Sequence, residues 1–182
     1  MTCLFAPSLD EIGQSVRNNI QLIIDHVGLP LAVGPLSDDD YKILCGGYGE
    51  LEWDYALSTY GNSREKYEFC IKLVQQGRVQ GIPSGAAICV YGVEKNIFRI
   101  HMIERFSRED ESHPLKGRMV LLTLMSAFIF CKAVECKVVH IVEPVPELVQ
   151  YYESFGFRME QCGYVMSAVI DELQDIFLKF AQ

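Results

Sequence analysis

The sequence has no apolar run long enough to cross a membrane. Its longest apolar stretch without a charged residue covers residues 119–131, whereas a membrane-spanning helix needs about 20 apolar residues. The first ten residues lack both the basic segment and the apolar segment of a secretory signal. We therefore expect no membrane span, no export and a cytoplasmic protein.

The sequence also lacks an excess of basic residues. Its 16 lysines and arginines stand against 24 aspartates and glutamates, which gives a formal net charge of -8. Nucleic-acid binding depends on a basic surface that neutralises phosphates. The composition therefore predicts no nucleic-acid partner and instead favours cationic ligands.

No cysteine pair has C-x-x-C spacing, and the four histidines have neither H-x-H nor H-x-x-x-H spacing. Such spacings are typical of zinc and redox sites. The cysteines are odd in number and most lie in apolar stretches; they are residues 3, 45, 70, 89, 131, 136 and 162. We expect reduced thiols in the core, without disulfides and without a metal.

What is present fits a single domain over residues 1–182. The chain is 49% hydrophobic and 22% charged, which is close to the average for globular proteins. Its length is near the usual size of one domain, and there is no repeat and no low-complexity linker. The chain therefore has enough apolar residues for one substantial core.

Periodicity divides the chain into helices and strands. Capping residues and a 3.6-residue period predict helices over residues 8–27, 37–46, 50–60, 116–135 and 146–155, with a closing helix from Asp171. Runs of β-branched and aromatic residues predict strands over residues 68–74, 85–93, 96–106, 137–143, 157–159 and 164–170. The expected fold class is α+β, with helices on both faces of a mixed, mostly antiparallel sheet.

One connection in this arrangement must be parallel. A long helix over residues 116–135 separates the strand at 96–106 from the strand at 137–143. A strand–helix–strand crossover of this kind places its two strands in parallel. We expect one parallel pair in an otherwise antiparallel sheet.

Around this crossover the chain resembles the GNAT acyltransferase superfamily. The resemblance is carried by Tyr152, Gly156 and Phe157, which match a Tyr-x-x-x-Gly-Phe signature at the end of a short helix. It implies a GNAT-like fold and an acyl-CoA-dependent N-acyltransferase, with acetyl-CoA or another acyl-CoA as co-substrate. The acceptor would be an amine of a small molecule or a protein. By the same resemblance, Tyr152 is the general acid for the leaving thiolate.

The resemblance also places coenzyme A. Members of this superfamily bind its pyrophosphate through an R/Q-x-x-G-x-G/A loop at the start of the central helix. Gly117 matches the first glycine of that loop, whereas Pro114 and Met119 depart from it. Lys116 and Arg118 still supply cations to a helix start, where free N–H groups favour anions. The candidate donor-binding residues are these and the strand residues expected beside the pantetheine arm, namely Met102, Ile103, Arg105, Lys116, Gly117, Arg118 and Met119.

Transfer of an acyl group to an amine also needs a base. Our first candidate is Glu104, because a carboxylate beside Met102 and Phe106 would have its pKa raised by burial. Glu143, at the end of the following strand, and His140 are the next candidates. In a regular strand His101 and Glu104 would point to opposite faces unless a bulge intervenes.

Two alternatives stay open. Arg105 and Phe106 are similar to an Arg-Phe pair of the acyl-homoserine-lactone synthases, which share this fold and take acyl groups from an acyl carrier protein. The acidic residues Glu50, Glu52 and Asp54 resemble their acidic cluster only loosely. The departures in the glycine loop suggest instead a non-catalytic GNAT-like binding domain. The closing helix, with Phe177 and Phe180, would either cover the sheet or dock a second copy in a homodimer.

Overall fold

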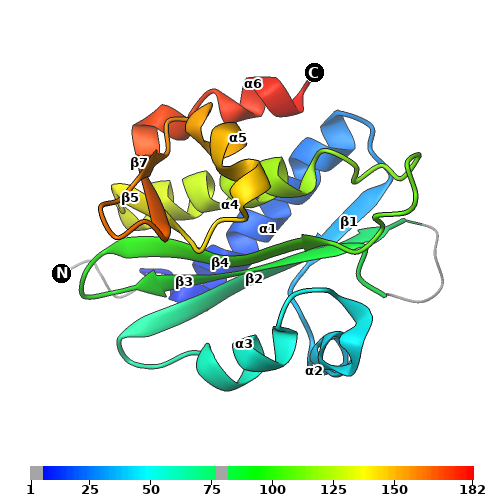
Figure 1. Cartoon of the computed structure of the whole chain (residues 1–182), viewed down its shortest axis with the longest axis horizontal. Coiled ribbons are helices and arrows are strands. Elements are labelled where there is room, and N and C mark those ends of the chain that lie inside the picture. Colours follow the sequence, from blue (N-terminus) through cyan, green and yellow to red (C-terminus); the bar gives the residue numbers. More distant parts are fainter. Residues whose placement is uncertain (1–5, 77–81) are drawn as a thin grey trace.

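The computed structural model describes residues 6–76 and 82–182, so Cys3 lies outside the described residues (Figure 1). The helices are α1 (Leu9–His26), α2 (Asp38–Ile43), α3 (Trp53–Thr59), α4 (Met119–Val134), α5 (Val149–Glu153) and α6 (Ile176–Phe180). The strands are β1 (Leu31–Gly34), β2 (Lys66–Gln75), β3 (Gly85–Gly92), β4 (Ile97–Arg105), β5 (Val138–Val142), β6 (Arg158–Met159) and β7 (Val165–Val169).

These strands form one seven-stranded sheet in the order β1-β2-β3-β4-β5-β7-β6. Among the described strands, β4 and β5 are the only parallel pair, and all other neighbours are antiparallel. Helices α1, α4 and α6 lie on one face, and α2 and α3 lie on the other (Figure 1). The predicted α+β class, with its single parallel crossover and two covered faces, is confirmed.

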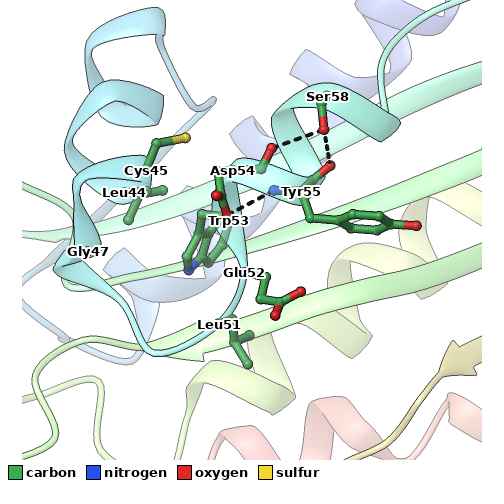
Figure 2. A pocket seen from close by; sticks show the side chains of 9 residues that line it. All are labelled: Leu44, Cys45, Gly47, Leu51, Glu52, Trp53, Asp54, Tyr55 and Ser58. Atoms are coloured by element: carbon green, nitrogen blue, oxygen red, sulfur yellow. Dashed lines mark hydrogen bonds between the residues drawn. The ribbon is translucent and has the colours of Figure 1, made fainter.

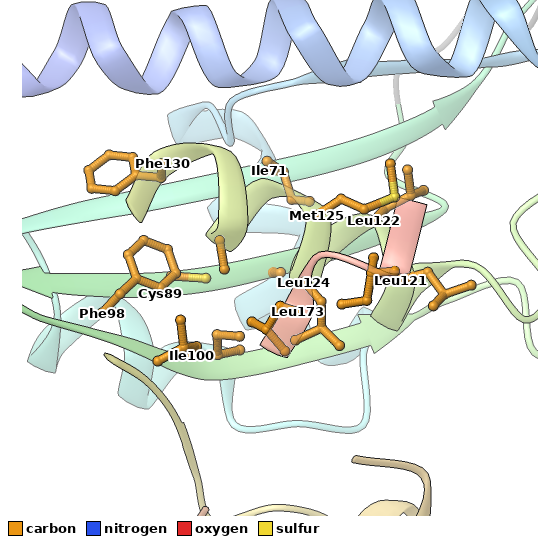
Figure 3. Packing of buried hydrophobic residues seen from close by; sticks show 14 of the residues in the cluster. Ile71, Cys89, Phe98, Ile100, Leu121, Leu122, Leu124, Met125, Phe130 and Leu173 are labelled. Atoms are coloured by element: carbon orange, nitrogen blue, oxygen red, sulfur yellow. The ribbon is translucent and has the colours of Figure 1, made fainter. Parts of the chain in front are cut away.

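Helix α4 lies at the centre of the core. It packs on the sheet and against helices α1 and α6, which explains why its sequence is apolar nearly all round. Figure 3 shows its side chains facing the strands and Leu173. Phe130 lies at the centre of an aromatic group, with ring centroids 5.2 Å from Phe98 and 5.6 Å from Phe69. Phe177 packs on Phe128 and Phe180 is buried, so the closing helix contributes to this core.

Three elements differ from their predictions. The edge strand β1 was not predicted. The closing helix is divided into a 3-10 turn over Ile170–Leu173 and the short helix α6. Helix α4 begins at Met119 rather than near residue 116, because Gly117 has a positive φ of 72° and Arg118 is not helical.

The free edge of β1 is occupied by a side chain from α1. The amide oxygen of Gln21 accepts a hydrogen bond from the backbone N–H of Val33 at 2.8 Å. Its amide nitrogen donates to the carbonyl of Leu31 at 3.1 Å. One glutamine therefore binds two backbone groups of the outermost strand.

Strand β4 contains a bulge at His101. Ile100 pairs with Cys89 and Met102 pairs with Ile88, so His101 is an extra residue opposite a single step of β3. Ile100 packs in the core beneath α4, whereas Met102 packs with Trp53 on the α3 side. The bulge thus reverses the face to which the following residues point.

Candidate active site

The parallel strands β4 and β5 separate beyond the bulge. Their pairing ends at Ile100 and Ile141, so residues 101–105 of β4 have no partner on β5. The separation leaves a cavity of about 70 Å³, here called the splay cavity. It is lined by Leu51, Ile100, His101, Met102, Ile103, Ile141, Val142, Glu143, Pro144, Val145, Leu148 and Tyr152.

A larger groove of about 610 Å³, here called the α4 groove, adjoins the splay cavity. Ile103 and Leu148 line both spaces, so the two are neighbours. The groove is lined by Ile103, Arg105, Gly117, Arg118, Met119, Val120, Leu148 and Tyr151. It therefore brings the middle of the bulged strand to the start of the central helix.

The start of α4 offers unpaired donors to this groove. The first helical hydrogen bond is from the N–H of Leu122 to the carbonyl of Arg118, at 2.9 Å. The N–H groups of Met119, Val120 and Leu121 precede it and therefore have no acceptor within the helix. No side chain caps them among the described residues. Such a helix start favours a bound anion.

The cationic side chains near this helix start differ in their hydrogen-bond and ion-pair partners. Arg118 donates to the carbonyl of Pro114 at 2.7 Å, and Lys116 forms an ion pair with Glu111. Arg105 has a buried guanidinium nitrogen, Nη1, with no hydrogen-bond partner among the described residues. Arg105 also lines the α4 groove, and a guanidinium there suits an anionic ligand such as a phosphate.

Tyr152 faces the splay cavity from α5. Gly156, with a φ of 105°, turns the chain out of this helix, and the buried Phe157 follows. The Tyr152 side chain is 3% exposed. Burial, and to a smaller extent Tyr151, raises the pKa of Tyr152 to about 12. The hydroxyl therefore holds its proton at neutral pH and is available as a donor within the cavity.

Glu104 does not have the raised pKa that its sequence context suggested. It is buried, and burial alone would raise its pKa, but its carboxylate accepts four hydrogen bonds that lower the pKa overall. Oε2 accepts from the N–H of Glu50 at 2.6 Å and from Arg108 at 2.7 Å. Oε1 accepts from the N–H of Leu51 at 3.0 Å and from the Trp53 indole at 2.9 Å. The expectation of a raised pKa is wrong, and the carboxylate is already engaged.

Glu143 and His101 line the splay cavity with Tyr152. Glu143 directly follows β5 and has a φ of 51°, which is uncommon for a residue with a side chain. His101, to which the sequence assigned no role, stacks on Tyr60 with ring centroids 4.4 Å apart. Burial, with smaller contributions from Arg99 and Lys66, lowers the pKa of His101 to about 4. His101 is therefore uncharged at neutral pH.

His140 is not among the described residues that line this cavity. It lies in the middle of β5, paired with Arg99 on one side and Ser167 on the other. Burial and the charge of Arg99 lower its pKa. The structure thus separates His140 from Glu143, which the sequence placed on the same strand.

A third space, here called the α3 pocket, lies on the face of the sheet opposite α4 and measures about 600 Å³. Leu51 lines both this pocket and the splay cavity. Figure 2 shows that Glu52 and Tyr55 extend to the same side of the start of α3, with Asp54 nearby. The pocket is lined by Leu44, Cys45, Gly47, Leu51, Glu52, Trp53, Asp54, Tyr55 and Ser58.

Three further observations concern the described residues. No group of three or more histidine, cysteine or acidic side chains within residues 6–76 and 82–182 could hold a metal ion. The cysteines of these ranges are unbridged. None of the helices described is both long and apolar enough to cross a bilayer.

No family model and no curated protein matches the sequence. Solved structures do match. Mutant forms of the spermidine/spermine N-acetyltransferase SpeG from Vibrio cholerae share 14% identity at a TM-score of 0.55, covering 80% of this chain and 97% of that chain. A GNAT-family acetyltransferase from Staphylococcus aureus shares 9% identity at a TM-score of 0.53, covering 77% and 99%. An uncharacterized protein from Bacillus halodurans shares 11% identity at a TM-score of 0.58, covering 83% of this chain and 90% of that chain. The chain therefore has the GNAT fold.

Proposed function

We propose that this protein is an N-acyltransferase that moves a short acyl group, acetyl above all, from coenzyme A to an amine. The observation that carries the proposal is the adjacency of the α4 groove and the splay cavity, which share Ile103 and Leu148 as lining residues. A helix start suited to phosphates thus lies next to a cavity lined by Tyr152 and Glu143.

The residues of the α4 groove fit the donor. The free N–H groups at the start of α4 and the guanidinium of Arg105 would bind its diphosphate. Lys116, Gly117, Arg118 and Met119 would form the same site. The unpaired edge of β4 at Met102 and Ile103 offers backbone groups to the pantetheine arm.

Within the splay cavity, the amine nitrogen would attack the thioester carbonyl carbon. A C–N bond forms and the C–S bond breaks, so the amine loses a proton and the thiolate gains one. Tyr152 supplies the proton to the sulfur. Glu143 receives the proton of the amine, directly or through a water, and neutral His101 lies beside this path. Glu104 has no part in this transfer because its oxygens are engaged elsewhere.

The size of the splay cavity supports a short acyl group. At about 70 Å³ this cavity is much smaller than the neighbouring α4 groove of about 610 Å³, which favours a small acyl group over a long chain. A carrier-protein-dependent synthase of acyl-homoserine-lactone type handles longer chains. Phe106, the aromatic half of the Arg-Phe pair, instead packs against Trp53 and Tyr48. These two observations disfavour the synthase alternative.

A cationic amine suits the acceptor side. The chain carries a net charge of -8, and Glu52 and Asp54 line the α3 pocket while Glu143 lines the splay cavity. Carboxylates attract a protonated amine before one of its nitrogens is deprotonated. Because one protein of similar fold is a spermidine/spermine N-acetyltransferase, a polyamine is the first acceptor to test.

The test combines donor binding with product analysis. The protein is titrated with coenzyme A, acetyl-CoA and a long-chain acyl-CoA by calorimetry. It is then incubated with acetyl-CoA and spermidine, an aminoglycoside or a lysine-containing peptide, and products are identified by mass spectrometry. We expect acetyl-CoA binding and an N-acetylated amine, with turnover reduced about 10²-fold in Glu143→Gln. Donor binding without any acylated product would favour a non-catalytic binding domain, and absence of donor binding would overturn the proposal.

A further inference from the structure

The bonds of Glu104 connect two segments that border different substrates in the proposed function. Two of its four donors are the backbone N–H groups of Glu50 and Leu51, and a third is the Trp53 indole. All three belong to residues 49–53, here called the wall segment. Leu51 of this segment lines the splay cavity and the α3 pocket, where the acceptor would bind.

The fourth donor connects Glu104 to the other side of the site. Arg108 lies in the β4–α4 loop, residues 106–118, and its guanidinium binds Glu104 and also Glu50, at 3.3 Å. The carbonyl of Arg108 accepts a 3.5 Å contact from the guanidinium of Arg105, which lines the α4 groove. A continuous series of polar contacts thus runs from the groove through Glu104 to the wall segment.

The wall segment packs against this carboxylate without spare room. A Cβ atom added at Gly49 would lie 2.7 Å from Glu104 Oε1, 2.7 Å from Trp53 Nε1 and 2.8 Å from the ring of Phe106. Separations this short do not occur between such atoms, so only glycine fits. Trp53 is itself 1% exposed. The position of Leu51 therefore depends on the Glu104 carboxylate.

We propose that Glu104 is a positioning residue that holds the wall segment against the splay cavity and fixes it to the β4–α4 loop. This inference rests on the proposed N-acyltransferase function. In Glu104→Gln the side chain keeps one acceptor oxygen. In either orientation of the amide, two of the four donors then face an NH2 group. The wall segment loosens, and acceptor binding weakens more than the chemical step.

The experiment compares wild type with Glu104→Gln, Arg108→Gln and the control Glu94→Gln, which changes an exposed carboxylate in the turn between β3 and β4. Acetyl-CoA is the donor, and the acceptor is whichever amine of the panel above is acetylated fastest. We expect Glu104→Gln to raise the acceptor KM about tenfold with kcat within about threefold. Arg108→Gln should raise the KM values of both substrates about threefold. Glu94→Gln should match wild type.

Two measurements examine the wall segment without turnover. Hydrogen exchange reports the amides of Glu50 and Leu51, which should exchange at least about tenfold faster in Glu104→Gln. Trp53 is the single tryptophan of the chain, so its fluorescence reports loss of its bond to Glu104. If Glu104→Gln does not fold, Arg108→Gln, which changes a half-exposed side chain, provides the same comparison.

The outcomes separate the two proposals. Unchanged exchange and unchanged acceptor KM in Glu104→Gln would overturn the positioning role. So would a large fall in kcat at constant KM with loss of the acidic limb of the pH profile, because that pattern identifies Glu104 as the base itself. If wild type shows no turnover, the N-acyltransferase proposal fails, while exchange and Trp53 emission still decide whether Glu104 holds the wall segment.

Discussion

Ile100 and Met102 are two residues apart on β4 yet pack on opposite faces of the sheet. Ile100 contributes to the core beneath α4, and Met102 packs with Trp53. The bulge at His101 produces this reversal at the point where β5 separates from β4. It places Ile103 and Arg105 toward the α4 groove and Glu104 toward the wall segment. The bulge therefore determines on which face of the sheet each of these side chains lies.

Removing the hydroxyl of Tyr152 should impair turnover without unfolding the chain. Tyr152→Phe keeps the ring in place but removes the proton donor, so kcat should fall about 10²-fold with acetyl-CoA. Because the pKa of Tyr152 is raised to about 12, wild-type kcat should not fall through its ionisation below about pH 10. Steady-state kinetics across this pH range measure both effects.

The matched control for that variant is Tyr41→Phe, which removes a part-buried hydroxyl bound to Glu68 at 2.7 Å on helix α2. It should leave kcat unchanged. If Tyr152→Phe retained kcat within about threefold of wild type, the proton donor would have to be another group.

Replacing Arg105 should weaken donor binding. Arg105 lines the α4 groove and its buried Nη1 has no partner among the described residues, so Arg105→Gln removes a cation from the expected phosphate site. The Kd for coenzyme A should rise about tenfold, and less at high salt because screening weakens the interaction. Calorimetric titration at two salt concentrations measures this, with the exposed Arg64→Gln as control. Equal affinity of the two variants would place the phosphate elsewhere.

Helix α2 is held on the sheet by a buried ion pair, and breaking it should cost stability. Asp40 Oδ2 lies 2.6 Å from the Lys72 ammonium, with the Asp40 side chain 5% exposed. Asp40→Asn should lower the free energy of unfolding by about 3 kcal/mol, because it leaves a largely buried lysine unpaired. Asp39→Asn, whose carboxylate is 90% exposed and pairs with Lys42 at 3.8 Å, should have almost no effect.

The cost of Asp40→Asn should depend on pH. Burial alone would raise the pKa of Asp40, but the bonds from Lys72 and Ser37 outweigh it and lower that pKa. The contribution of the carboxylate is therefore complete above its unfolded pKa of about 3.9 and is lost as pH falls through the lower folded value. Denaturant unfolding from pH 7 to the lowest pH at which the chain stays folded tests this. If the difference in unfolding free energy between wild type and Asp40→Asn grew as the pH fell, this prediction would be wrong.

Gly156 should tolerate no side chain. Its φ is 105°, and a Cβ there would meet the carboxylate and the Cβ of Glu172. Gly156→Ala should destabilise the fold by about 2 kcal/mol, from backbone strain and this collision together. Gly163→Ala adds a Cβ at a φ of 82° into open space and should cost about 1 kcal/mol from strain alone. If thermal unfolding showed the same loss of stability in both variants, the contact with Glu172 would be easily relieved.

The long helices and strands could be predicted from the sequence because the spacing of their apolar residues indicates which face is buried. The helix expected over residues 8–27 is α1, and that expected over 116–135 contains α4. Strand β1 was missed since it spans only four residues and its partner β2 lies some forty residues further along the chain. The crossover was recognisable because a long helix between two strands leaves few topologies.

The site was less predictable because its geometry depends on contacts distant in sequence. The burial of Glu104 followed from its neighbours, but three of its donors lie more than 50 residues earlier. Those donors decide whether the pKa rises or falls. The alternation of buried and partly buried residues along β4 is regular and does not reveal the bulge, although the residues on its two sides belong to different faces.

The contacts of Gln21 with β1 have a consequence for behaviour at high concentration. An open sheet ends in a row of unsatisfied backbone groups to which another chain can add a strand. The Gln21 amide donates to one such group and accepts from another, as an added strand would. At the opposite edge, β6 is only two residues long and includes an arginine. Both borders of the sheet are thereby protected against strand-by-strand polymerisation, and Gln21→Ala should make the protein more prone to form fibrils.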